Sequence, residues 1–295
     1  MPDSRVFITR RVPDRVRAEL ERSFTADVHD EELPPPREEL LSRAATCDGL
    51  LTMLTDRVDA ELLDAAGPQL RVVANYAAGL DNVDLEECKR RGITVSNTPD
   101  VLTDATAEMT IALMLALTRR VVEGDRHLRR GEVWQWAPTF MLGPHLAGLT
   151  LGIVGYGRIG QAVASLAEAH GMKVVHSLPL DELLAAADIV SLHVPLTDDT
   201  RRLIGERELG LMKPTAYLVN TSRGPVVDEV ALAQALAEGR VAGAALDVFE
   251  REPDVEPMLL QLDNVVLTPH IASATHQARE AMGMLCVEAL REVLL

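Results

Sequence analysis

The sequence predicts an α/β protein of two domains, each built on a parallel sheet, with a cleft between them. Strand-like apolar runs alternate with helical patterns along most of the chain, which is typical of βαβ units. A glycine-rich turn, GYGRIG, separates a strand-like run from a helical pattern near the middle of the chain. The length of 295 residues is long for one hydrophobic core and suits two.

The first hundred residues predict a five-stranded parallel sheet. The expected strands are RVFITR (5–10), TADVHD (25–30), GLLTMLT (49–55), LRVVANY (70–76) and ITVSNTP (93–99). Helical patterns separate them and start near Asp14, Arg37, Asp59 and Val83. Segments of this length leave room for the crossover helices that parallel strands require.

A long helix is predicted from Asp104 to Val122, with Thr103 or Asp104 as its N-cap. The stretch 109–117 carries no charge, so we expect burial on every side, at a subunit or domain interface. The irregular segment 131–148 follows and holds both tryptophans, Trp134 and Trp136. It is either a surface loop with an anchored ring or an arm that reaches a partner subunit.

The second half of the chain predicts another parallel sheet. Its expected strands are LTLGIVG (149–155), MKVVHS (172–177), DIVSLHVP (188–195), TAYLVNTS (215–222), AGAALDVF (242–249) and NVVLTPH (264–270). Helices are expected at 158–170, 181–187 and 274–295. The last helix follows the end of the second sheet, so we expect it to return to the first domain. The domains are therefore 1–98 plus 272–295, and 99–271.

Composition narrows the class of protein. Hydrophobic residues make up 47% and charged residues 25%, as in a globular protein. A formal net charge of −16 argues against nucleic acid as a partner, because phosphate binding needs a basic surface. No run is long and apolar enough to span a bilayer, and the first residues lack a signal peptide's apolar core, so we expect a cytoplasmic protein. The three cysteines are widely spaced, and no metal site is visible.

GYGRIG fits the dinucleotide-binding pattern G-x-G-x-x-G, with glycines at 155, 157 and 160. Gly155 would form the tight turn, Gly157 would admit a pyrophosphate, and Gly160 would pack helix against strand. We therefore expect Rossmann-like or flavodoxin-like domains that bind NAD(H) or NADP(H). The acidic residue that usually binds the adenosine ribose is missing. Asp181 lies at nearly the right distance but is expected to be a helix N-cap.

Three residues just past strand ends suggest the chemistry. Strand ends of a parallel sheet converge on one edge, so Arg223, Glu252 and His270 should meet there. Arg223 would grip the carboxylate and carbonyl oxygen of a 2-oxo acid, and His270 would deliver a proton. Glu252 would hold the imidazole and keep it protonated, with Glu250 as the rival carboxylate. The expected reaction is hydride transfer.

The chain resembles the D-isomer-specific 2-hydroxyacid dehydrogenases, and among them the glyoxylate/hydroxypyruvate reductases. The motifs that carry the resemblance are NYAAGLDNVD, VSNTPDVLTDATAE, GIVGYGRIGQAVA, LVNTSRGPVVDE, GAALDVFEREP and LTPHIAS, in this order. By this resemblance Arg223, Glu252 and His270 are the catalytic residues, and Glu252 rather than Glu250 matches the family position. Residues 1–98 plus 272–295 would be the substrate domain, and 99–271 the dinucleotide-binding domain.

The resemblance also implies further contacts. Leu54, the amides of Ala78 and Gly79, and Arg223 would bind the substrate. The implied coenzyme contacts are Gly155, Gly157, Arg158, Ile159, Gly160, Val194, Pro195, Thr221, Ser222, Arg223, Asp247, His270 and Ala272, with Asp247 facing the nicotinamide carboxamide. The family dimerises through its dinucleotide domain, so we expect a homodimer.

The chain departs from the family after Ser177, where relatives usually have roughly fifteen more residues, forming a helix and an edge strand. Either the protein has lost these residues, or the printed sequence omits a disordered stretch that the protein has. A true loss would weaken coenzyme binding. The expected activity is reduction of glyoxylate or hydroxypyruvate by NADH or NADPH. The alternatives are a phosphoglycerate or D-lactate dehydrogenase, a dinucleotide-sensing corepressor of the same fold, and a folded enzyme that has lost coenzyme binding.

Overall fold

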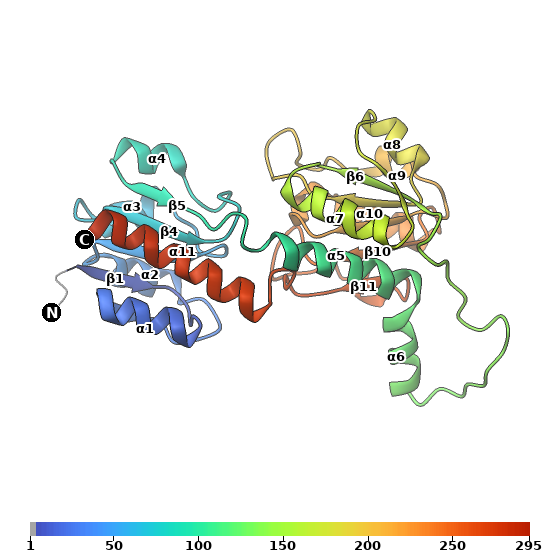
Figure 1. Cartoon of the computed structure of the whole chain (residues 1–295), viewed down its shortest axis with the longest axis horizontal. Helices are drawn as coiled ribbons and strands as arrows, with labels where there is room; N and C mark the ends of the chain where they lie inside the picture. Colours follow the sequence, from blue (N-terminus) through green and yellow to red (C-terminus); the bar gives the residue numbers. More distant parts are fainter. Residues whose placement is uncertain (1–3) are drawn as a thin grey trace. The chain divides into compact units, whose positions relative to one another are not determined.

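The computed structural model describes residues 4–295 (Figure 1). The chain divides into two compact units, one comprising residues up to Leu102 together with Ala274–Leu295, and the other Thr103–Ser273. Each unit carries its own parallel sheet, of five and six strands respectively. The predicted α/β class with two parallel sheets is therefore confirmed.

The first unit is a five-stranded sheet in the order β2-β1-β3-β4-β5, with every neighbouring pair parallel. Its elements are β1 (Arg5–Ile8), α1 (Asp14–Ser23), β2 (Thr25–Val28), α2 (Arg37–Ala44), β3 (Gly49–Met53), α3 (Ala60–Ala66), β4 (Val72–Tyr76), α4 (Leu85–Arg90), β5 (Thr94–Ser96) and α11 (His276–Leu294). Two aspartates cap helices: Asp59 accepts a hydrogen bond from the Leu62 amide, and Asp84 from the Glu87 amide. Such caps explain where α3 and α4 begin.

The C-terminal helix α11 packs on this first sheet. Two glycines permit the close approach, since a Cβ on Gly49 would lie 2.9 Å from Leu290 and one on Gly283 would lie 2.4 Å from Val16. The Tyr76 hydroxyl also donates a hydrogen bond to a carbonyl of α11, that of Arg279. These contacts join the last twenty or so residues of the chain to the unit formed by its first hundred.

The second unit is a six-stranded parallel sheet in the order β11-β10-β9-β8-β6-β7. Its elements are α5 (Thr103–Thr118), α6 (Val121–Arg129), β6 (Thr150–Val154), α7 (Arg158–Ala169), β7 (Lys173–Val175), α8 (Leu180–Ala186), β8 (Ile189–Leu192), α9 (Glu206–Leu211), β9 (Tyr217–Asn220), the 3-10 turn η1 (Gly224–Val226), α10 (Glu229–Ala237), β10 (Gly243–Leu246), the 3-10 turn η2 (Leu259–Gln261) and β11 (Val265–Leu267).

Both faces of this sheet are covered, which explains the continuous apolar runs of its strands. Neighbouring strand residues point to opposite faces, so Leu218 packs in the core beneath α8, α9 and α10, whereas Val219 packs in the core beneath α5 and α7. Packing on both faces therefore fixes the carboxyl ends of the strands, and the loops that follow them can vary in sequence.

The register places one row of residues at the carboxyl edge of the second sheet. Val154 pairs with Leu192, Leu192 with Asn220, Asn220 with Leu246, and Leu246 with Leu267. The residues that come next, among them Gly155, Thr221 and Asp247, therefore stand along one edge.

Three sequence predictions about helices need correction. The helix predicted from Asp104 to Val122 begins at Thr103 itself. It ends at Thr118, because Arg120 adopts a left-handed φ of 53° and the chain restarts as α6. Asp181 is not an N-cap, since α8 starts at Leu180 after Pro179. Helices α9 and α10 were not predicted, because their short patterns lie between strong strand signals.

Between 109 and 117, α5 is largely but not wholly buried, with Ala112 exposed. Over the described residues, no helix combines the length and the apolar character that crossing a membrane requires.

Candidate functional site

The glycine turn after β6 is built as a cradle. Gly155 has a φ of +98°, and a Cβ there would lie 2.6 Å from the His193 carbonyl carbon. A Cβ on Gly160 would lie 2.2 Å from the Gly155 oxygen, so the turn and α7 pack backbone to backbone. By contrast, no atom lies within 4 Å of the Cβ position of Gly157. The space over Gly157 is therefore open to a ligand.

This cradle fits a dinucleotide. The amino end of α7 begins at Arg158 and Ile159, and its amides and dipole favour a phosphate. Val194, half-buried, and Pro195, exposed, follow β8 on the same edge after His193. His193 beside them is held by Ser191 at 2.8 Å, and burial lowers its pKa to about 4. It is therefore uncharged near neutral pH and is no candidate for the proton donor.

His270 and Glu252 form a pair at the carboxyl edge. His270 Nδ1 lies 2.9 Å from Glu252 Oε2, and the Phe249 amide donates to Glu252 Oε1 at 3.0 Å. Burial alone would raise the pKa of the Glu252 carboxyl. The hydrogen bond and charge of His270, together with the Phe249 amide and the charge of Arg223, outweigh burial, so the pKa lies below its ordinary value. The ionised carboxylate thus faces the imidazole.

Asp247 holds the turn that carries His270. Its buried carboxylate accepts hydrogen bonds from the Thr268 hydroxyl at 2.6 Å, the Ile271 amide at 2.9 Å and the Ala272 amide at 2.7 Å. The His270 amide donates to the Asp247 carbonyl at 2.8 Å, and His270 itself has a left-handed φ of 53°. Asp247 has no exposed surface, so it acts here as the support of the histidine turn.

Arg223 is presented by a turn that Asn220 organises. The buried Asn220 side chain accepts from the Ser222 amide at 3.0 Å and donates to the Arg223 carbonyl at 3.0 Å. Thr221 is buried, with its hydroxyl 3.0 Å from that of Thr110 on α5. A Cβ on Gly224 would lie 1.8 Å from the Phe249 backbone. This close approach brings the Arg223 turn against the loop of Glu252.

The first unit has a turn with two available backbone amides at the carboxyl edge of its own sheet. Asn75 donates to the Gly79 carbonyl at 3.1 Å, and Asn97 to the Ala78 carbonyl at 2.7 Å. Among the described residues, nothing accepts a hydrogen bond from the amides of Ala78 and Gly79. Leu54, half-buried, follows β3 on the same edge. The turn presents two amide donors beside an apolar side chain.

Two other carboxylates that the sequence analysis considered and set aside each pair with an arginine. Glu250 pairs with Arg202 at 2.9 Å, and Asp181 accepts from Arg207 at 3.1 Å. The structure therefore brings His270 together with Glu252, and it pairs Asp181 with Arg207.

The sequence analysis did not predict the roles of Asn75, Asn220 and Glu229, whose side chains hydrogen-bond to the backbone of the site loops. Glu229 is a buried carboxylate at the start of α10 that accepts from the amides of Glu250 and Glu256. For the two asparagines, the signal was a polar side chain at the start of a predicted site segment, NYAAG or NTSRG, directly after an apolar run.

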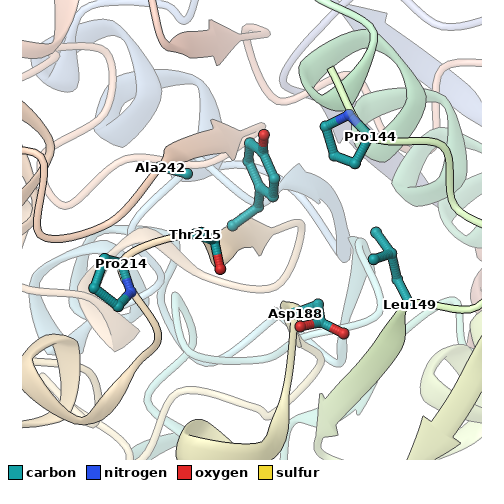
Figure 2. A pocket seen from close by; sticks show the side chains of 7 residues that line it. Pro144, Leu149, Asp188, Pro214, Thr215 and Ala242 are labelled. Atoms are coloured by element: carbon teal, nitrogen blue, oxygen red, sulfur yellow. The ribbon is translucent and has the colours of Figure 1, made fainter. Parts of the chain in front are cut away.

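A shallow cavity of about 360 Å³ lies at the opposite edge of the second sheet (Figure 2). It is lined by residues that precede or start strands, such as Leu149, Asp188 and Tyr217. Asp188 is already bound by Lys213 at 2.7 Å and by the Thr150 amide at 2.8 Å. Ligands of parallel sheets bind at the carboxyl edge, so this cavity is not the candidate site. No metal-binding group of His, Cys, Asp and Glu is found in residues 4–295.

Comparison with known proteins agrees with this geometry. The model of the D-isomer specific 2-hydroxyacid dehydrogenase NAD binding domain matches residues 111–272. A glyoxylate reductase of Pyrococcus furiosus is 50% identical over 307 aligned residues, which cover 97% of this chain and 91% of the relative. Because that alignment is longer than the 295-residue chain, the relative has residues that this chain lacks.

Solved structures are similar over nearly the whole chain. A protein from Thermus thermophilus has a TM-score of 0.92 and 48% identity, covering 98% of this chain and 96% of that one. An NADPH-dependent glyoxylate/hydroxypyruvate reductase of Sinorhizobium meliloti, solved with NADP and malonate, has a TM-score of 0.83 and 33% identity, covering 98% and 92%. The chain therefore belongs to the D-isomer specific 2-hydroxyacid dehydrogenase family, and its residues 111–272 form the family's NAD-binding domain.

Proposed function

We propose that this protein reduces glyoxylate or hydroxypyruvate to the 2-hydroxy acid with NADH or NADPH. The observation that carries the proposal is the His270–Glu252 pair, which stands with Arg223 on the same sheet edge as the open glycine cradle. The relatives named glyoxylate reductase support the choice of substrate. We assign the substrate role to 1–98 plus 272–295, and the dinucleotide role to 99–271.

Each residue has a role in the proposed reaction. A bound reduced nicotinamide supplies the hydride that goes to the carbonyl carbon. His270 donates a proton to the carbonyl oxygen, so that the product is the hydroxy acid. Glu252, ionised, stabilises the charged imidazole before that transfer. Arg223 polarises the carbonyl oxygen and pairs with the carboxylate, and the amides of Ala78 and Gly79 bind the same carboxylate.

The remaining assignments concern the coenzyme and support of the site. Gly155, Gly157, Arg158, Ile159 and Gly160 would take the pyrophosphate. Val194, Pro195, Thr221, Ser222 and Ala272 would line the rest of the coenzyme site. Asp247 supports the turn of His270, and by the family resemblance it would also face the nicotinamide carboxamide.

The test is oxidation of NADH and NADPH with a panel of 2-oxo acids that includes glyoxylate, hydroxypyruvate and pyruvate. We expect turnover with the first two. His270→Ala should lose at least 100-fold in kcat, since a positioned acid contributes a factor of about 10² to 10⁴, and should keep its affinity for coenzyme. A panel without turnover, with coenzyme still bound, would favour the dinucleotide-sensing role. Full activity of His270→Ala would exclude the assigned acid.

We also propose a homodimer formed through the dinucleotide domain. Large apolar side chains are exposed on α6 and the following segment, which extend from the body of the second unit (Figure 1). They form what we call the arm patch: Val121, Leu128, Val133, Trp134, Trp136, Phe140 and Leu142. Seven exposed large apolar side chains on one protruding segment favour a role in a protein interface.

A further inference from the structure

The second sheet lacks the strand that usually flanks the adenosine end of a bound dinucleotide. The order from one edge is β7-β6-β8-β9-β10-β11, whereas a doubly wound dinucleotide domain usually has a third strand outside the second. Here β7 is the edge strand, and four residues, 176–179, join it to α8. The end of β7, from which the ribose contact of such a domain usually comes, therefore lies at the open edge of the sheet.

The register shows what stands there. Val175 pairs with Gly152, so His176 and Ser177 come level with the last two residues of β6, Ile153 and Val154. This is the position from which a carboxylate usually binds the ribose hydroxyls and repels a 2′-phosphate. The segment 173–180 contains no carboxylate. The nearest one that follows, Asp181, is bound by Arg207.

An aromatic pair occupies the position instead. The His176 ring stacks on the Tyr156 ring of the glycine turn, with centroids 3.6 Å apart and an angle of 6° between planes. His176 Nδ1 lies 3.0 Å from the Ser177 hydroxyl. Both residues at the end of β7 are exposed. The stack thus fixes an imidazole and a hydroxyl beside the glycine cradle.

We propose that His176 and Ser177 form the adenosine-ribose contact of this protein, and that this contact accepts NADH and NADPH about equally. A hydroxyl and an imidazole can hydrogen-bond a ribose hydroxyl or a phosphate oxygen. Neither carries the negative charge by which a carboxylate rejects NADPH. The inference rests on the proposed coenzyme site and adds its specificity.

The experiment is isothermal titration of the full chain with NADH and with NADPH, without substrate. We expect two dissociation constants within about threefold of each other. A ratio above about tenfold in either direction would overturn the inference while leaving the proposed reductase intact. If neither coenzyme binds, the specificity inference and the proposed reductase activity are both overturned. This outcome is distinct from an unequal ratio, because the reductase needs one of the two coenzymes.

The variant His176→Asp introduces a carboxylate at the end of β7. It should weaken NADPH binding at least tenfold relative to NADH, through repulsion of the 2′-phosphate. His170→Asp is the matched control, because His170 is an exposed histidine at the other end of α7, where the helix stops before β7. We expect it to leave the ratio unchanged. Equal ratios in both variants would contradict the placement of the ribose at His176.

Discussion

At the scale of single residues, the site depends on groups that are forced into unusual states by their neighbours. His270 has a left-handed backbone, a conformation that few non-glycine residues adopt. Four hydrogen bonds to Asp247, from its own amide and from Thr268, Ile271 and Ala272, compensate for that conformation. A buried carboxylate thus sets the geometry of the residue that we propose as the proton donor.

Glu252 gives a prediction at the same scale, because its pKa is lower in the folded protein than in the unfolded chain. A carboxyl group of this kind stabilises the fold fully above its unfolded pKa of about 4.3 and loses that contribution as the pH falls through its folded pKa. Glu252→Gln should therefore lower Tm at pH 7, and the gap to the wild type should narrow below about pH 4. Thermal unfolding at pH 7 and at about pH 3 checks this.

The control for this prediction is Glu250→Gln, which removes a carboxylate that faces Arg202 instead of His270. We expect it to keep kcat within a few-fold of the wild type, whereas Glu252→Gln should lose about 100-fold at pH 7. A Tm gap for Glu252→Gln that stays constant from pH 7 to about pH 3 would contradict the assigned charge state.

At the scale of elements, α10 fixes the loop that carries Glu252. The Glu229 side chain reaches from the first turn of this helix to the amides of Glu250 and Glu256, on either side of Glu252. Burial raises the pKa of the Glu229 carboxyl, and no cation from residues 4–295 hydrogen-bonds to it. Two backbone amides depend on this one carboxylate.

We therefore expect Glu229→Ala to destabilise the protein by about 2–3 kcal/mol, because two buried donors lose their acceptor. The amides of Glu250 and Glu256 should exchange faster with deuterium, and kcat should fall as the Glu252 loop loosens. Glu238→Ala, an exposed position at the end of the same helix, is the control. Unchanged exchange at Glu250 and Glu256 would show that the loop is held by other contacts.

The secondary-structure elements differ in how well the sequence predicted them. Strands were predictable because continuous apolar runs end at glycine, proline or polar residues, as in GIVGYG and LVNTSRG, and the glycine turn follows from its spacing. The break at Arg120 was not predictable, because Arg119 and Arg120 are good helix formers and nothing in their pattern indicates the left-handed φ of Arg120. The support given by Asn220 and Glu229 depends on particular side-chain hydrogen bonds to the backbone, which periodicity does not encode.

At the scale of the whole molecule, the arm patch is the surface through which we propose that two copies associate. Trp136 is 81% exposed and Val133 98%, on a segment that leaves the body of its unit (Figure 1). The protein carries a net charge of −16, so two copies repel each other, and an apolar contact has to overcome this repulsion. A second copy offers an identical patch, as in a two-fold symmetric interface.

We expect a dimer at micromolar concentration in sedimentation velocity, and a weaker one in Trp136→Ala. Truncation of a tryptophan at the centre of an interface costs about 2 kcal/mol or more, which corresponds to an increase of about 30-fold in the dissociation constant. Leu260→Ala removes an exposed apolar side chain (59%) outside the arm patch, and should leave the dimer unchanged. Because screening by salt weakens the repulsion between the two acidic copies, the wild-type dimer should tighten as salt is raised. A monomer at every salt concentration, or equal dissociation constants for the two variants, would rule out this interface.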